Sequence, residues 1–303
     1  MRSDLSGIIV VDKPEGMTSA RVVAEVKKKL EAARVGHTGT LDPFATGVLI
    51  CCINQATRLA RFFLHGSKRY EGLLRLGSET DTQDATGQIV ATSPVPKLEQ
   101  AFLENLFKQF EGRQWQLPPV YAALKHEGTP LYKLARRGQP VQKPARPVTI
   151  TSLRILKVAL PDVRFEVACS AGTYVRTLCH DIGQAVGCGA HLAELRRTAS
   201  CGFSLDQAVA LDRLKAMDAA EQVGDVIVPM AEALRDMPAF SADDEMVTHI
   251  SHGRPLPPEP FTGRDPVNRP ADYLRVVDRS NRLKAVIKWS SESGTYIYCC
   301  VFK

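Results

Sequence analysis

The strands and helices that this sequence predicts follow one another in an irregular order, and that order constrains the fold more than any other feature. Short β-rich or wholly apolar runs predict strands, and apolar side chains at three- or four-residue spacing predict helices. The predicted strands cover residues 7–12, 48–53, 69–76, 147–159 and 163–169. The predicted helices cover residues 19–30, 56–64, 98–110 and 173–186. Because an all-parallel sheet requires regular alternation, we predict an α+β fold with a mixed, largely antiparallel central sheet flanked by helices.

A change in composition after about residue 237 divides the chain. Prolines are dense between residues 254 and 270, where long helices cannot form. Three short predicted strands follow, at residues 273–278, 283–289 and 295–302. A chain of 303 residues is long enough for about two domains. We therefore predict a larger domain over residues 1–236 and a small β-rich domain over residues 237–303.

Simple features of the sequence exclude several classes of protein. Hydrophobic residues make up 44% of the chain and charged residues 24%, which is typical of a folded globular protein and not of a disordered or fibrous one. The apolar run near the N-terminus has four residues and the run at residues 48–53 has six, which is too short for a signal peptide or for a membrane span of about 20 residues. We expect a cytoplasmic protein with no membrane partner.

The sequence also lacks the motifs of common cofactor and metal sites. No Gly-Lys dipeptide of a phosphate loop occurs, and neither G-x-G-x-x-G nor G-x-S-x-G is present. The eight cysteines include two adjacent pairs and no CxxC, so we expect buried thiols without disulfides. The acidic residues Glu79, Asp81 and Asp84 lack the pattern of a calcium loop and are expected in a structured turn. We expect no metal and no nucleotide cofactor.

Positive charge is concentrated in one segment of the chain. The formal net charge is +6, and residues 125–157 contain eight basic residues against one acidic residue. Such a segment suits a polyanion, for example a nucleic-acid backbone. The alternative is an ordinary solvated face, and charge alone does not decide between the two.

A loop with three glycines, at residues 36–47, leads into the apolar strand predicted at 48–53. Pro43 disfavours the helical conformation at Asp42, so the Asp42 carboxylate is expected to project from extended backbone. A carboxylate placed in this way can act as a nucleophile or a general base, and His37 offers a flat ring for stacking. The alternative is a purely structural Asp-Pro turn.

Several segments spread over residues 7–205 resemble, in the same order, the motifs of the TruB family of tRNA pseudouridine synthases. The glycine-rich loop and the start of the following strand, residues 36–49, match the family's signature as GHTGTLDPFATGVL. The other matching segments are KPEGMTS at residues 13–19, KRY at 68–70, TDTQDATG at 80–87, PPVY at 118–121, GTYVR at 172–176 and LRRT at 195–198. The chain departs from the family at Ala122, where a serine is usual.

The resemblance implies a fold, a reaction and a substrate. It implies the pseudouridine synthase fold followed by a PUA-like RNA-binding domain, and the isomerisation of uridine to pseudouridine at position 55 in the T-loop of tRNA. The target base leaves the RNA stack, its N-glycosidic bond breaks and its C5 joins the ribose. The reaction requires no redox cofactor, nucleotide or metal. We expect the T-arm stem-loop of tRNA as the partner, and a monomeric enzyme.

The resemblance also implies roles for individual residues. Asp42 is the expected nucleophile, and Arg176 is expected to hold its carboxylate bidentately. Tyr70 is expected to stack on the flipped uracil, and Tyr174 to bind the nucleotide near Asp42. Three routes stay open for Asp42: attack on C1′ of the ribose, addition to C6 of the uracil, and action as a base toward a glycal intermediate.

Three further features are expected to contact the RNA. His37 would fill the position that the extruded base leaves, and Leu195 would form an apolar wall of the uracil pocket. The basic residues of segment 125–157 would lie along phosphates of the T-arm and contribute affinity more than sequence choice.

Two other functions could use the same residues. The first is an RNA-binding protein that remodels tRNA without catalysis, which would not need Asp42. The second is a nucleoside or glycoside hydrolase that uses Asp42 with another carboxylate, which would release free uracil.

Overall fold

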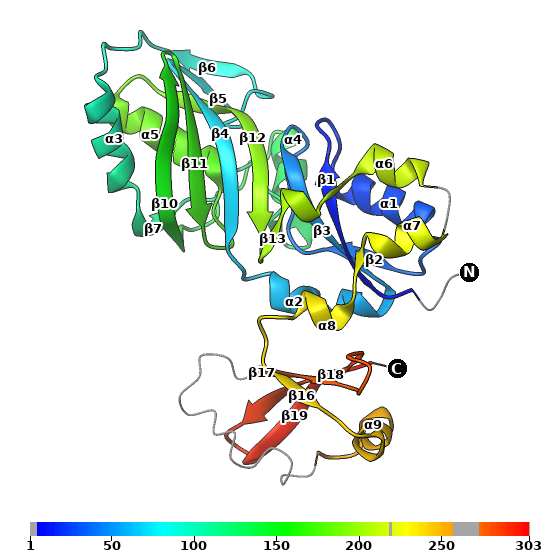
Figure 1. Cartoon of the computed structure of the whole chain (residues 1–303). Helices are drawn as coiled ribbons and strands as arrows, with labels where there is room; N and C mark the ends of the chain where they lie inside the picture. The colour runs from blue at the N-terminus through cyan, green and yellow to red at the C-terminus, as the bar shows by residue number, and fades with distance from the viewer. Residues whose placement is uncertain (1–4, 218–219, 257–272, 303) are drawn as a thin grey trace.

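A mixed sheet of eleven strands forms the body of the molecule (Figure 1), as described by a computed structural model over residues 5–217, 220–256 and 273–302. Its main path runs in the order β14 (Val209–Ala210), β1 (Gly7–Lys13), β3 (Thr46–Ile53), β12 (Ala190–Ser200), β4 (Lys68–Leu76), β11 (Asp162–Cys169), β10 (Arg146–Ala159) and β7 (Gly112–Gln116). Three short strands join it at the side: β2 (Val35–His37), β13 (Phe203–Ser204) and β15 (Ile227–Val228). The pairs β14–β1 and β3–β12 are parallel and the others antiparallel. The predicted α+β class is confirmed.

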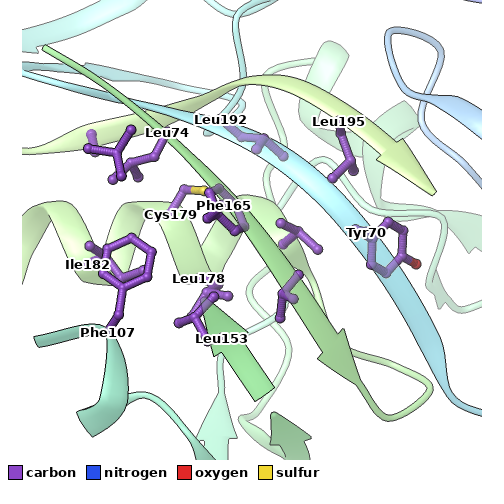
Figure 2. Packing of buried hydrophobic residues seen from close by; sticks show 14 of the residues in the cluster. Tyr70, Leu74, Phe107, Leu153, Phe165, Leu178, Cys179, Ile182, Leu192 and Leu195 are labelled. Carbon is purple, nitrogen blue, oxygen red and sulfur yellow. The ribbon is translucent and has the colours of Figure 1, made fainter. Parts of the chain in front are cut away.

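Helices cover the β10, β11, β4 and β12 part of the sheet on one face. They are α3 (Gln100–Gln109) and α5 (Val175–Val186). Phe107 of α3 and Ile182 of α5 pack with Phe165 of β11 in one hydrophobic cluster (Figure 2). Figure 2 also shows Tyr70 and Leu195 at one end of this cluster. The cluster also contains Leu41 of the loop that carries Asp42.

The strand β3 is buried on both faces. On one face, α1 (Ser19–Lys29) and α6 (Leu211–Ala216) pack on it, with α7 (Ala220–Asp225) beside them. On the other face lie the 3₁₀ helix η1 (Asn54–Leu59), α2 (Ala60–Phe63) and α8 (Met230–Ala233). Cys51 belongs to the first cluster and Cys52 to the second, so the adjacent thiols point to opposite faces. All eight cysteines are free; six are buried as predicted, whereas Cys201 and Cys299 are half-buried.

A second sheet contains the strands predicted near the C-terminus. Its order is β16 (Ala239–Ser241), β17 (Tyr273–Val277), β18 (Leu283–Ser290) and β19 (Thr295–Val301), and α9 (Asp244–Ser251) contacts β18. The three predicted strands are confirmed. Strand β16 was not predicted because it has only three residues. The predicted proline-rich loop lies largely at residues 257–270, outside the described residues.

The remaining elements are short and lie in the connections. They are β5 (Ser78–Thr80) paired with β6 (Ile89–Thr92), β8 (Lys125–His126) paired with β9 (Thr129–Pro130), α4 (Leu131–Arg136) and η2 (Leu205–Gln207). Within the described part of the chain, no helix has the length and apolar character needed to cross a bilayer.

One prediction about the elements is wrong, and one long strand was not predicted. The helix predicted at residues 56–64 is instead the 3₁₀ helix η1 followed by one turn of α-helix in α2. Asn54 leaves strand β3 with φ 48°, and the Thr57 hydroxyl donates to its carbonyl at 2.7 Å, which favours a tight turn at this point. The central strand β12 was not predicted because Glu194, Arg196 and Arg197 interrupt its apolar pattern.

Candidate active site

A cavity of about 300 Å³ lies where the loop after β2 meets β4, β12 and the start of α5. Five of the six residues singled out from the sequence line it, namely Asp42, Tyr70, Tyr174, Arg176 and Leu195. His37 does not line the cavity but lies beside it, since its Nδ1 accepts a hydrogen bond from the lining residue Gly39 at 3.3 Å. The fold therefore brings together residues that are up to 153 positions apart, Asp42 and Leu195.

The loop that carries Asp42 is fixed by a buried lysine. Lys13 ends strand β1, and its Nζ donates to the carbonyls of Pro14 at 2.8 Å, Met17 at 2.6 Å and Pro43 at 3.1 Å. The Ser19 hydroxyl adds a bond to the Leu41 carbonyl at 3.0 Å. Burial lowers the pKa of Lys13 to about 8. These contacts hold the segments on both sides of Asp42 against the start of α1.

Arg176 holds the Asp42 carboxylate with two nitrogens. Its Nε lies 2.9 Å from Oδ2 of Asp42, and its Nη2 donates to Oδ1 at 3.4 Å. The Arg176 side chain is buried, whereas 34% of the Asp42 side chain is exposed toward the cavity. Burial raises the pKa of the Asp42 carboxyl, and the positive charge of Arg176 opposes that rise. A carboxylate paired with a cation on one side and open on its other side can react with a bound molecule.

The acidic turn after β5 supports this ion pair. Asp84 accepts hydrogen bonds from the Thr82 hydroxyl at 2.8 Å and from the Thr86 hydroxyl at 2.6 Å, which confirms the structured turn. Its other oxygen lies 3.6 Å from Nε of Arg176. Sequence reasoning assigned Asp84 no part in the site, although the segment 80–87 had been noticed as a motif.

Two tyrosines and a leucine supply the apolar walls. Tyr70 is buried, and this burial raises the pKa of its hydroxyl while nearby Arg197 opposes the rise. The guanidinium carbon of Arg146 lies 4.7 Å from the centre of the Tyr174 ring, a cation–π contact. Leu195 is buried on the same cavity. The space between these groups is suited to a flat, mostly apolar ring with polar edges.

Two cations in the cavity were missed from the sequence. Arg197 is buried in strand β12 and Lys68 at the start of β4, and both line the cavity. Both lie in segments that match a motif, KRY and LRRT. A basic residue within a strand pattern is the sequence signal that could identify them. At Ala122 a buried methyl group stands where the family usually has a serine.

The basic segment 125–157 is not one continuous strip on the molecule. Lys133, Arg136 and Arg137 are exposed on and after α4, whereas Arg146 lines the cavity. Arg154 forms an ion pair of 2.5 Å with Glu166 of β11, and Lys157 lies eleven residues beyond Arg146 on β10, which is roughly 35 Å along the strand. Only the part near α4 and the cavity is therefore free to follow a single polyanion.

No cluster of three or more metal-binding side chains occurs among the residues that the structure describes.

Comparison with known proteins places the chain in a family. Residues 27–175 match the model of the TruB family pseudouridylate synthase (N terminal domain), and residues 176–235 match the tRNA pseudouridylate synthase B C-terminal domain. The tRNA pseudouridine synthase B of Syntrophotalea carbinolica is 45% identical over 251 residues, covering 83% of this chain and 82% of that protein. The protein of the same name from Stutzerimonas stutzeri is 41% identical over 285 residues, covering 93% of this chain and 91% of that protein.

Solved structures agree with this result. The crystal structure of a Cbf5–Nop10–Gar1 complex contains a chain with a TM-score of 0.71 and 28% identity, covering 98% of this chain and 84% of that one. An H/ACA RNP bound to a substrate RNA containing 2′-deoxyuridine contains a similar chain, with a TM-score of 0.68 and 26% identity, covering 95% of this chain and 80% of that one. The chain described here belongs to the TruB family of pseudouridylate synthases.

Proposed function

We propose that this protein isomerises uridine to pseudouridine at position 55 in the T-loop of tRNA. The observation that carries the proposal is the Asp42 carboxylate, held by Arg176 and open toward a cavity with tyrosine and leucine walls. The relatives named tRNA pseudouridine synthase B align with this chain over most of its length. An RNA substrate also agrees with the exposed basic residues on and after α4.

In the proposed reaction, the target nucleotide leaves the RNA stack and enters the cavity. His37 fills the vacated place in the stack, and burial lowers the pKa of this histidine, which favours its neutral ring. Tyr70 and Leu195 contact the base, and Tyr174 binds the nucleotide next to Asp42. The C1′–N1 bond breaks, the base turns, the C1′–C5 bond forms, and the proton on C5 is lost while N1 gains one. Asp42 is the nucleophile in this scheme.

The rest of the molecule is proposed to bind the tRNA. We assign residues 1–236 to the catalytic domain and residues 237–303 to a PUA-like RNA-binding domain, which the separate four-stranded sheet supports. We propose that the T-arm stem-loop is the recognised part of the tRNA, that the enzyme acts as a monomer, and that it works in the cytoplasm.

The test is incubation of wild type and of Asp42→Asn with an unmodified tRNA transcript, followed by mapping of pseudouridine to a nucleotide. We expect product at the T-loop uridine from wild type only, with equal tRNA binding by both proteins. Turnover retained in Asp42→Asn would remove Asp42 from the chemistry. Binding without product in either protein would favour a tRNA-remodelling protein, and free uracil in the mixture would favour a hydrolase.

A further inference from the structure

Arg197 is a buried cation, and two of its three nitrogens donate hydrogen bonds to backbone carbonyls. The residue is 1% exposed and lines the cavity together with Lys68 and Tyr70. Its Nε donates to the Val48 carbonyl at 2.7 Å, and its Nη2 donates to the Gly39 carbonyl at 3.0 Å. Its Nη1 is buried and donates to no carbonyl or carboxylate within the part of the chain that the structure describes, although the Tyr70 hydroxyl interacts with the same guanidinium. Because buried donors are nearly always paired, Nη1 is a donor that suits an acceptor on a molecule bound in the cavity.

The charged groups around the cavity also show an excess of positive charge. Among the described residues, the carboxylates paired with a cavity-lining cation are Asp42 and Asp84, and both of them pair with Arg176. Neither Arg197 nor Lys68 has a carboxylate partner there. Buried charges are normally compensated, so this arrangement suits a ligand that carries or develops negative charge.

Gly39 leaves a path open to Nη1. A Cβ atom at this position would lie 3.7 Å from Nη1 of Arg197 and 3.5 Å from Cε of Lys68. Gly39 itself lines the cavity. Because it has no side chain, an atom of the substrate can approach Nη1 without moving the loop.

We propose that Nη1 of Arg197 donates a hydrogen bond to a carbonyl oxygen of the extruded uracil and stabilises the negative charge that the base carries after the glycosidic bond breaks. This inference rests on the proposed function. When the C1′–N1 bond breaks, its electron pair stays on the base and the charge spreads from N1 to O2 and O4. The base loses this charge when the C1′–C5 bond forms, and the later loss of the C5 proton is matched by the gain of a proton on N1, so the contact is strongest while the base is detached.

The position of Arg197 favours the base over a backbone phosphate as the acceptor. Arg197 is almost completely buried, whereas Arg146 lies beside Tyr174 with part of its surface exposed. A phosphate is charged in every state of the reaction and remains at the mouth of the cavity with the RNA backbone. Arg146 is therefore better placed for the phosphate, and Arg197 for the base.

The test pairs a substitution in the protein with one in the substrate. Synthetic T-arm stem-loops carry uridine, 2-thiouridine or 4-thiouridine at the target, and single-turnover rates and Kd are measured for wild type and Arg197→Lys. We expect Arg197→Lys to lower the single-turnover rate on uridine by about 100-fold, which is the typical effect of losing one oxyanion donor. Sulfur accepts hydrogen bonds weakly, so one of the two thio positions should slow wild type about tenfold and Arg197→Lys hardly at all.

Two results would overturn the inference. If both sulfur effects are as large in Arg197→Lys as in wild type, Nη1 does not contact the base. If the substitution weakens Kd and leaves the single-turnover rate unchanged, Arg197 contacts a phosphate. Wild type that forms no pseudouridine at all would instead overturn the proposed function, which separates the two failures.

Arg197→Lys leaves the carbonyl of Val48 or of Gly39 without its hydrogen-bond donor, which can prevent folding. A second variant tests the inference in that case. Gly39→Ala keeps both anchors, places a methyl group in van der Waals contact with Nη1 and requires no left-handed backbone. We expect a wild-type free energy of unfolding, a rate about tenfold lower and a reduced sulfur effect. A wild-type rate with the full sulfur effect would contradict the inference. The matched control is Arg196→Lys, whose guanidinium already pairs with Asp12 at 2.7 Å and which should keep the full sulfur effect.

Discussion

At the scale of single residues, Arg176 joins three segments of the chain around one carboxylate. Besides Asp42, its guanidinium donates to the Thr82 carbonyl through Nη1 and to the Tyr121 carbonyl through Nη2, each at 2.9 Å. A lysine has the charge but not the planar fork, so it cannot replace these contacts together. The position of the carboxylate and its ionisation therefore depend on the same side chain.

Replacing Arg176 by lysine should change both the rate and its pH dependence. Arg176 opposes the rise that burial causes in the pKa of Asp42, so a weaker partner lets that pKa rise further. Because the proposed mechanism requires the ionised form of Asp42, the acid limb of the rate profile should move to higher pH. Misplacement of the carboxylate should lower the plateau by about 100-fold. Single-turnover rates between about pH 5 and pH 9 measure both effects.

The control for this prediction is Arg75→Lys, because Arg75 pairs with Asp162 at 2.8 Å on an exposed part of the sheet. Its profile should match wild type. An Arg176→Lys profile with the acid limb of wild type would show that Arg176 does not set the ionisation of Asp42.

At the scale of elements, the site depends on the parallel contact between β3 and β12. Arg196 lies opposite Thr46, and Arg197 lies opposite Gly47. Gly47 has φ 102°, and a Cβ atom there would lie only 2.2 Å from the Arg197 carbonyl oxygen. Glycine is required at this point because the two backbones meet where the loop of Asp42 enters the sheet.

Gly47→Ala should therefore destabilise the protein and disturb the site together. The left-handed backbone alone costs about 1–2 kcal/mol for alanine, and separating the two strands should raise the loss to about 3 kcal/mol or more. Urea unfolding measures this loss. Gly112→Ala is the matched control, since Gly112 has φ 94° with no atom within 4 Å of the added Cβ, and it should lose only the backbone contribution. Equal losses in the two variants would contradict the role given to the close approach.

Sequence patterns predict a strand well when the pattern depends on the burial of that strand alone and not on which strands it pairs with. Strand β3 appears as an apolar run because both of its faces are buried, and β4 appears through its alternation. The loop at residues 36–47 was recognisable from its glycines and the Asp-Pro pair. Strand β12 was not, because its arginines donate to carbonyls and carboxylates of other strands, and local patterns do not show which strands become neighbours.

At the scale of the whole molecule, the two sheets share part of their apolar packing. Phe63 of α2 and Ala233 of α8 belong to one hydrophobic cluster with Val286 of β18 and Phe302. In Figure 1, α2 and α8 lie between the large sheet and the small one. The C-terminal sheet is thus packed on the body of the molecule.

The exposed cations on and after α4 should determine how strongly tRNA binding depends on salt. Each lysine or arginine that contacts a phosphate contributes about one unit to the slope of log K against log salt concentration. Replacing Lys133, Arg136 and Arg137 by glutamine should therefore reduce the slope by about two to three units and weaken Kd, with folding unchanged. Arg154→Gln is the control, because Arg154 is already paired with Glu166 and should leave the slope as in wild type. Titrations at several salt concentrations measure both slopes, and an unchanged slope in the triple variant would place the tRNA on another face of the molecule.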